Sequence, residues 1–182
     1  IKSIRASDPD AALYYLARMI DAGEDPVFIA RRLVISAAED VGLANPNGLA
    51  VAMAVQQAVN FVGMPEGRIP LAEAAIYLAT SPKSNSAYKA IDRALGKVRS
   101  SRDEPVPLHL RNAPTQLMKD LDYGKGYVYP HNDPEHFARA DNLPENIREE
   151  RFYEPGDLGS EQAIRERLES WWGERYRRKP SD

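Results

Sequence analysis

Hydrophobic residues in the first hundred positions recur every three to four residues, the spacing of an amphipathic helix. Polar residues fill the positions between them, so that each such segment has one apolar face. Five segments of this kind occur, at residues 9–22, 26–40, 46–62, 70–80 and 84–100. In the third, alanine and valine cover much of the circumference, which predicts that other helices approach it closely on several sides.

The starts of three of these segments share a local signal, a capping residue followed by proline: Asp8-Pro9, Asp25-Pro26 and Asn45-Pro46. A side-chain oxygen of Asp or Asn can accept a hydrogen bond from the free amides of a first helical turn. Proline is well suited to the first helical position, where its missing N–H is not needed. Gly23 is a candidate C-terminal cap for the first helix.

The pattern changes near Ser101, after which prolines become frequent. A short helix is predicted at residues 114–121. Tyr123, Tyr127 and Tyr129 suggest a hairpin or an extended segment. Residues 131–159 are predicted to be irregular. A final helix is predicted to start near residue 160, to carry the adjacent Trp171 and Trp172, and to end in the basic tail Arg177-Arg178-Lys179. Adjacent helical residues point in different directions, so we expect one indole to pack inward and the other to cover the tail or a neighbouring subunit.

These elements predict an all-α fold, a compact helical bundle with a largely irregular C-terminal extension and a last helix. Short connections between short helices are typical of such bundles. We expect the bundle to occupy residues 1–104 and the Pro/Tyr-rich extension, packed on the bundle, to occupy residues 105–182.

Composition narrows the possible functions. The 182 residues carry a net charge of −3 and contain no cysteine, which excludes disulfides, thiol catalysis and thiolate metal sites. A general basic footprint for nucleic acid is absent. No apolar run approaches the roughly 20 residues that cross a membrane, so no membrane partner is expected and a cytoplasmic location is predicted. The first residue is Ile, which suggests a piece of a longer protein.

No catalytic, cofactor or metal site is predicted. Gly124-Lys125-Gly126 has neither the upstream glycine nor the Ser or Thr of a phosphate-binding loop, so a turn is favoured. His131 and His136 lack a third converging ligand, and a surface turn is favoured there as well. His109 is expected to be a packed or hydrogen-bonded imidazole.

The fifth helical segment carries the one candidate binding surface. Lys89, Arg93 and Lys97 are spaced four residues apart on one face, and Arg99 and Arg102 follow. This basic stripe can be an ordinary solvated face, or it can contact DNA phosphates or an acidic partner. The opposite face of the helix is expected to pack inward, through the apolar residues Ala87, Ile91, Ala94, Leu95 and Val98.

Several blocks of the sequence resemble the C-terminal region of the replication-associated recombination protein A family (RarA, also called MgsA), whose eukaryotic relative is the Werner helicase-interacting protein. The blocks are Ser7-Asp8-Pro9-Asp10-Ala11-Ala12-Leu13-Tyr14, Gly23-Glu24-Asp25-Pro26 with Ala30-Arg31-Arg32, Ser36-Ala37-Ala38-Glu39-Asp40-Val41-Gly42, Ala79-Thr80-Ser81-Pro82-Lys83-Ser84-Asn85, Val106-Pro107-Leu108-His109-Leu110-Arg111-Asn112-Ala113-Pro114 and Tyr123-Gly124-Lys125-Gly126-Tyr127. They occur in order along nearly the whole chain, and the match is looser after about Asn142.

The resemblance implies an AAA+ ATPase related to clamp loaders that acts in replication, recombination and repair at stalled forks. ATP and Mg²⁺ would be held by an N-terminal module that this chain lacks. The present region would be the helical collar that assembles a homotetramer. DNA and single-stranded DNA-binding protein are the implied partners, and a nucleoid-associated cytoplasmic location follows.

Two functional hypotheses therefore remain. The first is an oligomerisation domain, without enzymatic activity of its own, from a DNA-dependent ATPase. The second is a helical nucleic-acid-binding module that uses the basic stripe. An enzyme with residues scattered along the sequence is the weakest alternative.

Overall fold

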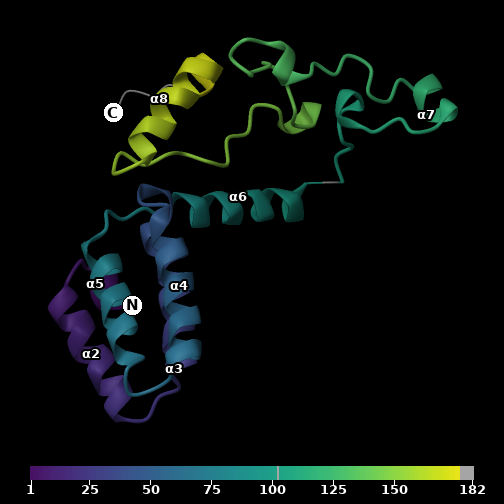
Figure 1. Cartoon of the computed structure of the whole chain (residues 1–182). Helices are drawn as coiled ribbons and strands as arrows, with labels where there is room; N and C mark the ends of the chain where they lie inside the picture. The colour runs from purple at the N-terminus through teal and green to yellow at the C-terminus, as the bar shows by residue number, and fades with distance from the viewer. Residues whose placement is uncertain (102, 177–182) are drawn as a thin grey trace. The chain divides into compact units, whose positions relative to one another are not determined.

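Helices form all the regular structure of residues 1–101 and 103–176, the part of the chain that the computed structural model describes. The α-helices are α1 (Lys2–Arg5), α2 (Pro9–Asp21), α3 (Pro26–Ser36), α4 (Asn47–Val62), α5 (Arg68–Thr80), α6 (Ser86–Ser100), α7 (Gln116–Asp120) and α8 (Glu161–Trp172) (Figure 1). The all-α class is confirmed, whereas α1 was not predicted. Residues 122–130, for which a hairpin or an extended segment was suggested, form turns and irregular backbone up to a short 3-10 helix that begins at Pro130.

The predicted start signals of α2 and α3 act as expected. The side chain of Asp8 accepts a hydrogen bond from the N–H of Ala11 at 2.9 Å, and that of Asp25 accepts one from the N–H of Val27 at 2.9 Å. Each is followed by a proline at the start of the helix. Gly23, with a φ of 78°, lies just after α2 in the left-handed conformation that glycine adopts readily.

The third start signal acts differently. The residue that caps α4 is Pro46, and no side chain caps the free amides. Asn45 instead donates from its side-chain amide to the hydroxyl of Tyr77 at 3.0 Å and to that of Ser81 at 3.1 Å. The expectation that Asn45 caps its own helix was therefore wrong, because its side chain is directed toward Tyr77 of α5 and Ser81 just after it, not toward the free amides of α4.

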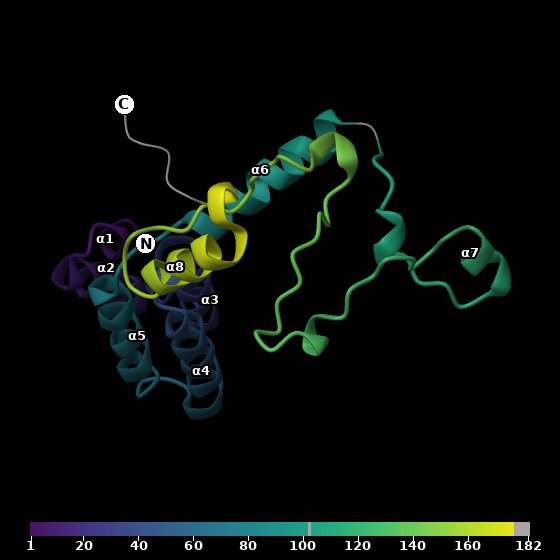
Figure 2. The same cartoon turned by 90° about the horizontal axis from the view of Figure 1, so that it is seen from above.

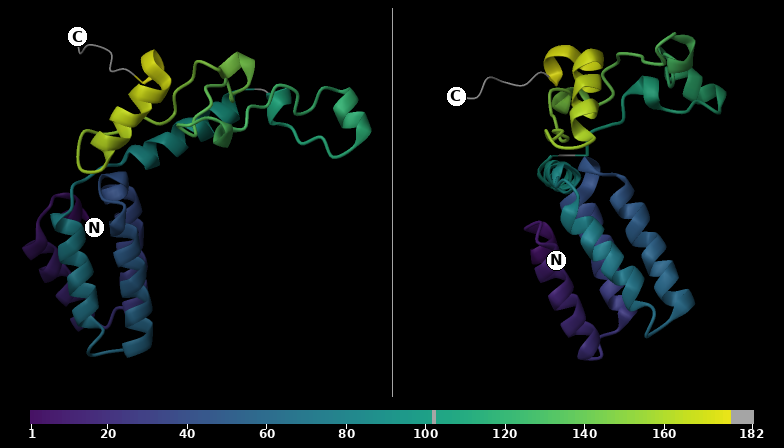
Figure 3. Two further views of the ribbon diagram at one scale, coloured as in Figure 1. Left: turned by 45° about the horizontal axis from the view of Figure 1, so that its top comes forward. Right: turned by 60° about the vertical axis from the view of Figure 1, so that its left-hand side comes forward.

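The hydrophobic core lies among α1 to α5, where α2 packs on α5, α3 on α4, and α4 on α5. These helices run alongside one another (Figures 1 and 3). Leu71 and Leu78 of α5 are completely buried at the centre. Alanines with no exposed surface lie on several helices, and their small side chains let helix axes approach closely: Ala30, Ala52, Ala74 and Ala79.

A turn of π-helix, Ala37–Val41, continues α3 and ends at Gly42. Gly42 has φ 50° and ψ −138°, a conformation that residues with a Cβ rarely adopt. A Cβ added there would lie 2.5 Å from the carbonyl oxygen of Ser84. The close approach lets the N–H of Ser84 donate to the backbone oxygen of Asp40 at 2.8 Å. Gly42 therefore joins the end of α3 to the segment before α6.

Residues 153–166 belong to the same compact unit as residues 1–91. Glu161, the first residue of α8, is completely buried, and its Oε1 accepts hydrogen bonds from the hydroxyls of Ser86 and, at 2.9 Å, Tyr153. The N–H of Ser160 donates to the oxygen of Ala44 at 2.9 Å. The beginning of α8 is thus held by polar contacts rather than by an apolar interface.

Of the described residues, the second compact unit comprises 92–101, 103–152 and 167–176. The basic tail Arg177-Arg178-Lys179, in which the last helix was predicted to end, lies outside the described residues. Most of the second unit, between α6 and α8, is irregular (Figure 2). Long-range polar contacts hold it: Lys97 pairs with Glu150 at 2.5 Å, and Arg175 donates to the backbone oxygen of Glu150 at 3.1 Å. Arg151 in turn donates to the backbone oxygen of Arg175 at 3.0 Å.

An aromatic cluster connects the two chain segments that make up the second unit. The ring of Phe137 stacks on Trp171, with centroids 5.3 Å apart, and meets Trp172 edge-on at 5.4 Å. The expectation that only one indole would cover the tail was therefore wrong. Trp172 is the last residue of α8, where the helical path ends, so both neighbouring side chains reach the same phenyl ring.

The apolar face of α6 is the largest departure from the sequence prediction. It was expected to pack inward, but Ile91, Leu95 and Val98 are 56%, 40% and 69% exposed. Ala87 is also exposed and Ala94 is half-buried. Ser86 is the residue of α6 that is buried, because only the first turn of this helix is held by the Glu161 contact.

We expect Gly42→Ala to destabilise the protein by about 1–3 kcal/mol, because the backbone conformation at this position is strained for any residue with a Cβ. Gly96→Ala is the matched control, since a Cβ at this helical position meets nothing within 4 Å. It should cause no loss and a gain of up to about 1 kcal/mol. Chemical denaturation followed by circular dichroism measures both, and equal stability of the two variants would contradict the role of Gly42.

Phe137→Ala should shift the tryptophan emission to longer wavelength, because both indoles lose the phenyl ring that covers them. The chain contains two tryptophans, so its emission reports on this cluster alone. Phe61→Ala is the control, because that ring is 92% exposed on α4. An unchanged spectrum for Phe137→Ala would show that the cluster does not persist in solution.

Candidate interaction surfaces

The basic stripe predicted from the sequence does lie on a helix, since α6 spans Ser86–Ser100. Its members are not equivalent, however. Lys97 is engaged by Glu150, Arg93 is half-buried, and Lys89 and Arg99 are exposed. Arg102 lies outside the described residues. The charge that the stripe can offer to a phosphate backbone is therefore smaller than the sequence suggests.

The Gly-Lys-Gly turn is tied to the chain rather than open to a ligand. Gly124 and Gly126 have φ angles of 76° and 81°, and the Nζ of Lys125 pairs with Asp122 at 3.0 Å. The N–H of Gly124 donates to the oxygen of Leu108 at 2.8 Å. The turn thus brings together two of the sequence blocks that resemble the family.

The histidines show no catalytic arrangement. His131 and His136 lie with ring centroids 5.0 Å apart, and His131 is the same distance from Tyr129. Within the described residues, no group of three or more His, Asp or Glu side chains is placed to hold a metal ion. His109 shares a hydrogen bond of 3.2 Å with the side-chain oxygen of Asn142, in agreement with the hydrogen-bonded imidazole that was favoured.

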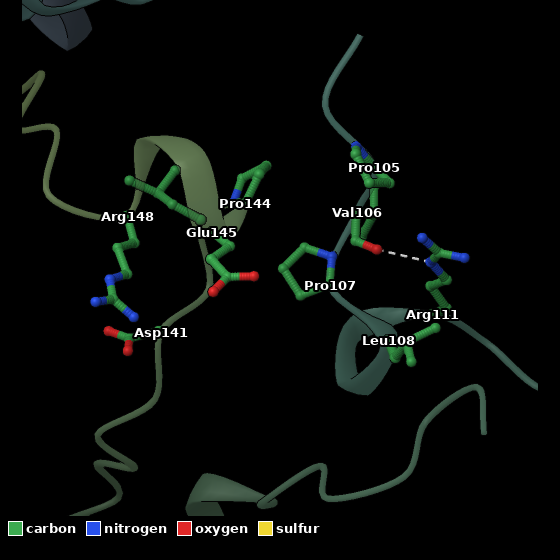
Figure 4. A pocket seen from close by; sticks show the side chains of 10 residues that line it. Pro105, Val106, Pro107, Leu108, Arg111, Asp141, Pro144, Glu145 and Arg148 are labelled. Atoms are coloured by element: carbon green, nitrogen blue, oxygen red, sulfur yellow. Dashed lines mark hydrogen bonds between the residues drawn. The ribbon is translucent and has the colours of Figure 1, made fainter.

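A small pocket of about 330 Å³ lies within the second unit, between residues 105–111 and 141–148 (Figure 4). Pro107 and Glu145 face each other across it. Arg111 is fixed beside the pocket, because its Nε donates to the oxygen of Val106 at 2.6 Å and its guanidinium lies 4.9 Å from the ring of Tyr123. Charges of both signs line the pocket, so it favours neither an anion nor a cation.

A buried carboxylate organises the blocks near the start of the chain. Asp40 is 6% exposed, and its two oxygens accept from the Nε of Arg5 at 2.5 Å and from the hydroxyl of Ser36 at 2.8 Å. The hydrogen bond to Asp40 raises the pKa of Arg5. These contacts connect α1 to the π-helical turn that continues α3. No role for Arg5, Ser36 or Asp40 was predicted from the sequence.

Lys83 completes this joint from the end of α5. Its Nζ donates to the backbone oxygens of Ala79 at 2.9 Å and Ser81 at 2.6 Å, and to the hydroxyl of Ser7 at 3.1 Å. Burial lowers the pKa of Lys83, and the nearby Asp40 opposes this shift. A lysine that satisfies helix-terminal carbonyls has a structural role. Residues 36–42 and 79–85, two of the blocks that resemble the family, therefore stabilise the fold at this place.

Among the exposed apolar surfaces of the described residues, two are candidates for contact with a partner. One is the face of α6 that carries Ile91, Leu95 and Val98. The other is a groove of about 760 Å³ between α2 and α5, which is lined mainly by apolar side chains and is bordered by Arg18, Asp21 and Arg68. Large exposed apolar surfaces are typical of protein–protein contacts. These two surfaces are better candidates for function than any polar cluster.

Comparison with known proteins identifies the family of this chain. A family model described as the C-terminal region of the MgsA AAA+ ATPase matches residues 6–172. The chain belongs to this family. It is 47% identical over 92% of its length to replication-associated recombination protein A of Coxiella burnetii and 44% identical over 98% to that of Escherichia coli K12. It is also 44% identical over 84% of its length to the ATPase WRNIP1 of Dictyostelium discoideum.

The family match confirms the resemblance found in the sequence. The similarity to the Dictyostelium ATPase shows that the resemblance extends to a eukaryotic protein. The chain spans 38% and 40% of the Coxiella and Escherichia proteins and 18% of the Dictyostelium ATPase. It corresponds to the C-terminal domain of AAA+ ATPases whose names refer to replication-associated recombination. Within the described residues, no helix is both long and apolar enough to span a membrane.

Proposed function

We propose that this chain is the oligomerisation domain of an AAA+ ATPase that acts on DNA in the cytoplasm, in replication, recombination and repair at stalled forks. Its assembled form is a homotetramer. ATP and Mg²⁺ are bound by a separate module of the longer protein, and this domain neither binds nor hydrolyses ATP. Contacts with DNA and with single-stranded DNA-binding protein belong to the assembled ATPase.

The exposed face of α6 is the observation that carries this proposal. Ile91, Leu95 and Val98 are spaced four and three residues apart, the repeat by which one helix packs against another. Lys89, Arg93 and Lys97 occupy a different face, so the helix is strongly amphipathic although its apolar side lies in solvent. Burial of apolar surface contributes roughly 25 cal/mol per Å², and a second copy of the chain can supply that burial.

The mass of the protein in solution tests the proposal directly. The chain weighs 20.3 kDa, and light scattering should give about four times this mass. A mass near that of one chain, at all concentrations tested, would contradict the proposed assembly.

The double variant Leu95→Asp and Val98→Asp should dissociate the assembly without unfolding the helices, because both side chains are exposed within one chain. Lys89→Asp is the matched control, since it places an acidic residue on another face of the same helix. Light scattering and circular dichroism distinguish dissociation from unfolding. A tetramer that survives the double variant would remove α6 from the interface.

A nucleic-acid interface on the basic stripe is the second candidate, favoured by the exposed Lys89 and by relatives named for replication-associated recombination. The variant Lys89→Glu with Arg93→Glu should weaken binding to single-stranded DNA and reduce the slope of affinity against salt by about one for each lost phosphate contact. Arg31→Glu with Arg32→Glu on α3 makes the same charge change elsewhere. If both double variants alter the slope equally, the stripe is an ordinary solvated surface.

A further inference from the structure

Exposed apolar side chains are frequent in the middle of the chain. Every described residue between positions 87 and 160 is at least partly exposed. Ordering the backbone of a segment costs about 1–2 kcal/mol per residue, which apolar burial normally offsets. The large side chains that are more than half exposed in this stretch, beyond α6, are Val106, Leu117, Leu121, Tyr127, Val128, Tyr129 and Leu158.

Helix α7 carries Leu117, the most exposed of these side chains, and ends just before Leu121. Leu117 and Leu121 are 68% and 53% exposed and, four residues apart, lie on the same side of the helical turn. The side chain of Thr115 caps the helix by accepting from the N–H of Met118 at 3.3 Å. The loop that carries α7 is closed at its base by the hydrogen bond from Gly124 to Leu108, and α7 lies at its far end (Figure 2).

The groove between α2 and α5 has the complementary properties. Leu13, Leu16 and Ile20 from α2 line it together with Ile69 and Ala72 from α5. Ile69 is 60% exposed, so the groove is open to a partner. A groove lined by two helices is a common receptor for an apolar side of a third helix.

The charges beside the two surfaces also match. Arg18 and Arg68 border the groove, and Arg68 is positioned by donating to the backbone oxygen of Pro65 at 2.6 Å. Asp21 lies at the same rim. Asp120, next to Leu121, is the acidic side chain that α7 offers to these arginines, because Asp122 already pairs with Lys125 at 3.0 Å. Complementary charges of this kind favour one partner and one orientation.

We propose that α7 of one copy inserts Leu117 and Leu121 into the α2/α5 groove of a second copy. This inference rests on the proposed self-association and names its contact. Each chain carries both the exposed leucines and the groove, so the contact joins two different surfaces of the two copies. Contacts of this type close into rings when the rotation between copies allows it.

Cysteine cross-linking tests the contact, because the natural chain contains no cysteine. Leu117→Cys and Ile69→Cys are made in separate chains, mixed, and oxidised. The expected product is a disulfide-linked pair that contains one chain of each variant. Leu117→Cys mixed with Gln57→Cys, an exposed position on α4, should give little of this product.

The outcomes separate this contact from the proposed function. A tetrameric mass without the specific cross-link overturns the docking of α7 and leaves the assembly in place. A monomeric mass overturns both. When both cysteines are placed in one chain, a disulfide formed within that chain at high dilution would also overturn the contact between copies.

Discussion

The completely buried apolar side chains of the described chain all lie between Ile4 and Ala79. The described residues after Ala79 therefore have no comparable apolar core to hold them. The first five helices bury their alanines and leucines against one another and form a stable unit. The remaining residues keep apolar side chains at the surface, and polar contacts determine how they are held. Exposed apolar surface of this kind is typical of a protein–protein contact.

Two buried carboxylates show how these polar contacts work. Asp40 is satisfied by Arg5 and Ser36, and it fixes the start of the bundle to the end of α3. Glu161 accepts from Ser86 and Tyr153, and it fixes the start of α8 to the start of α6. A buried carboxylate is costly without partners, so each of these contacts strongly favours one arrangement of the backbone. Two of the blocks that resemble the MgsA family, residues 36–42 and 79–85, lie at or next to the Asp40 contacts, where their role is structural.

The same distribution explains why assembly is the function that the geometry supports best. The polar clusters are occupied in holding helix ends and turns together. The accessible features are the apolar face of α6, the leucines of α7 and the α2/α5 groove. Their apolar chemistry suits a protein partner.

The sequence by itself determined the helices, most of their ends and the family. Helical periodicity and capping are local properties, and Asp8 and Asp25 cap their helices as their positions predict. The burial of each face was decided only by the tertiary structure. Ile91 and Leu95 have the spacing of core residues, but the described part of the chain leaves 56% and 40% of their surface exposed. Lys97 belongs to the basic stripe by spacing, yet Glu150, 53 residues away, engages its charge. Periodicity specifies which residues share a face, whereas packing between distant segments determines what that face contacts.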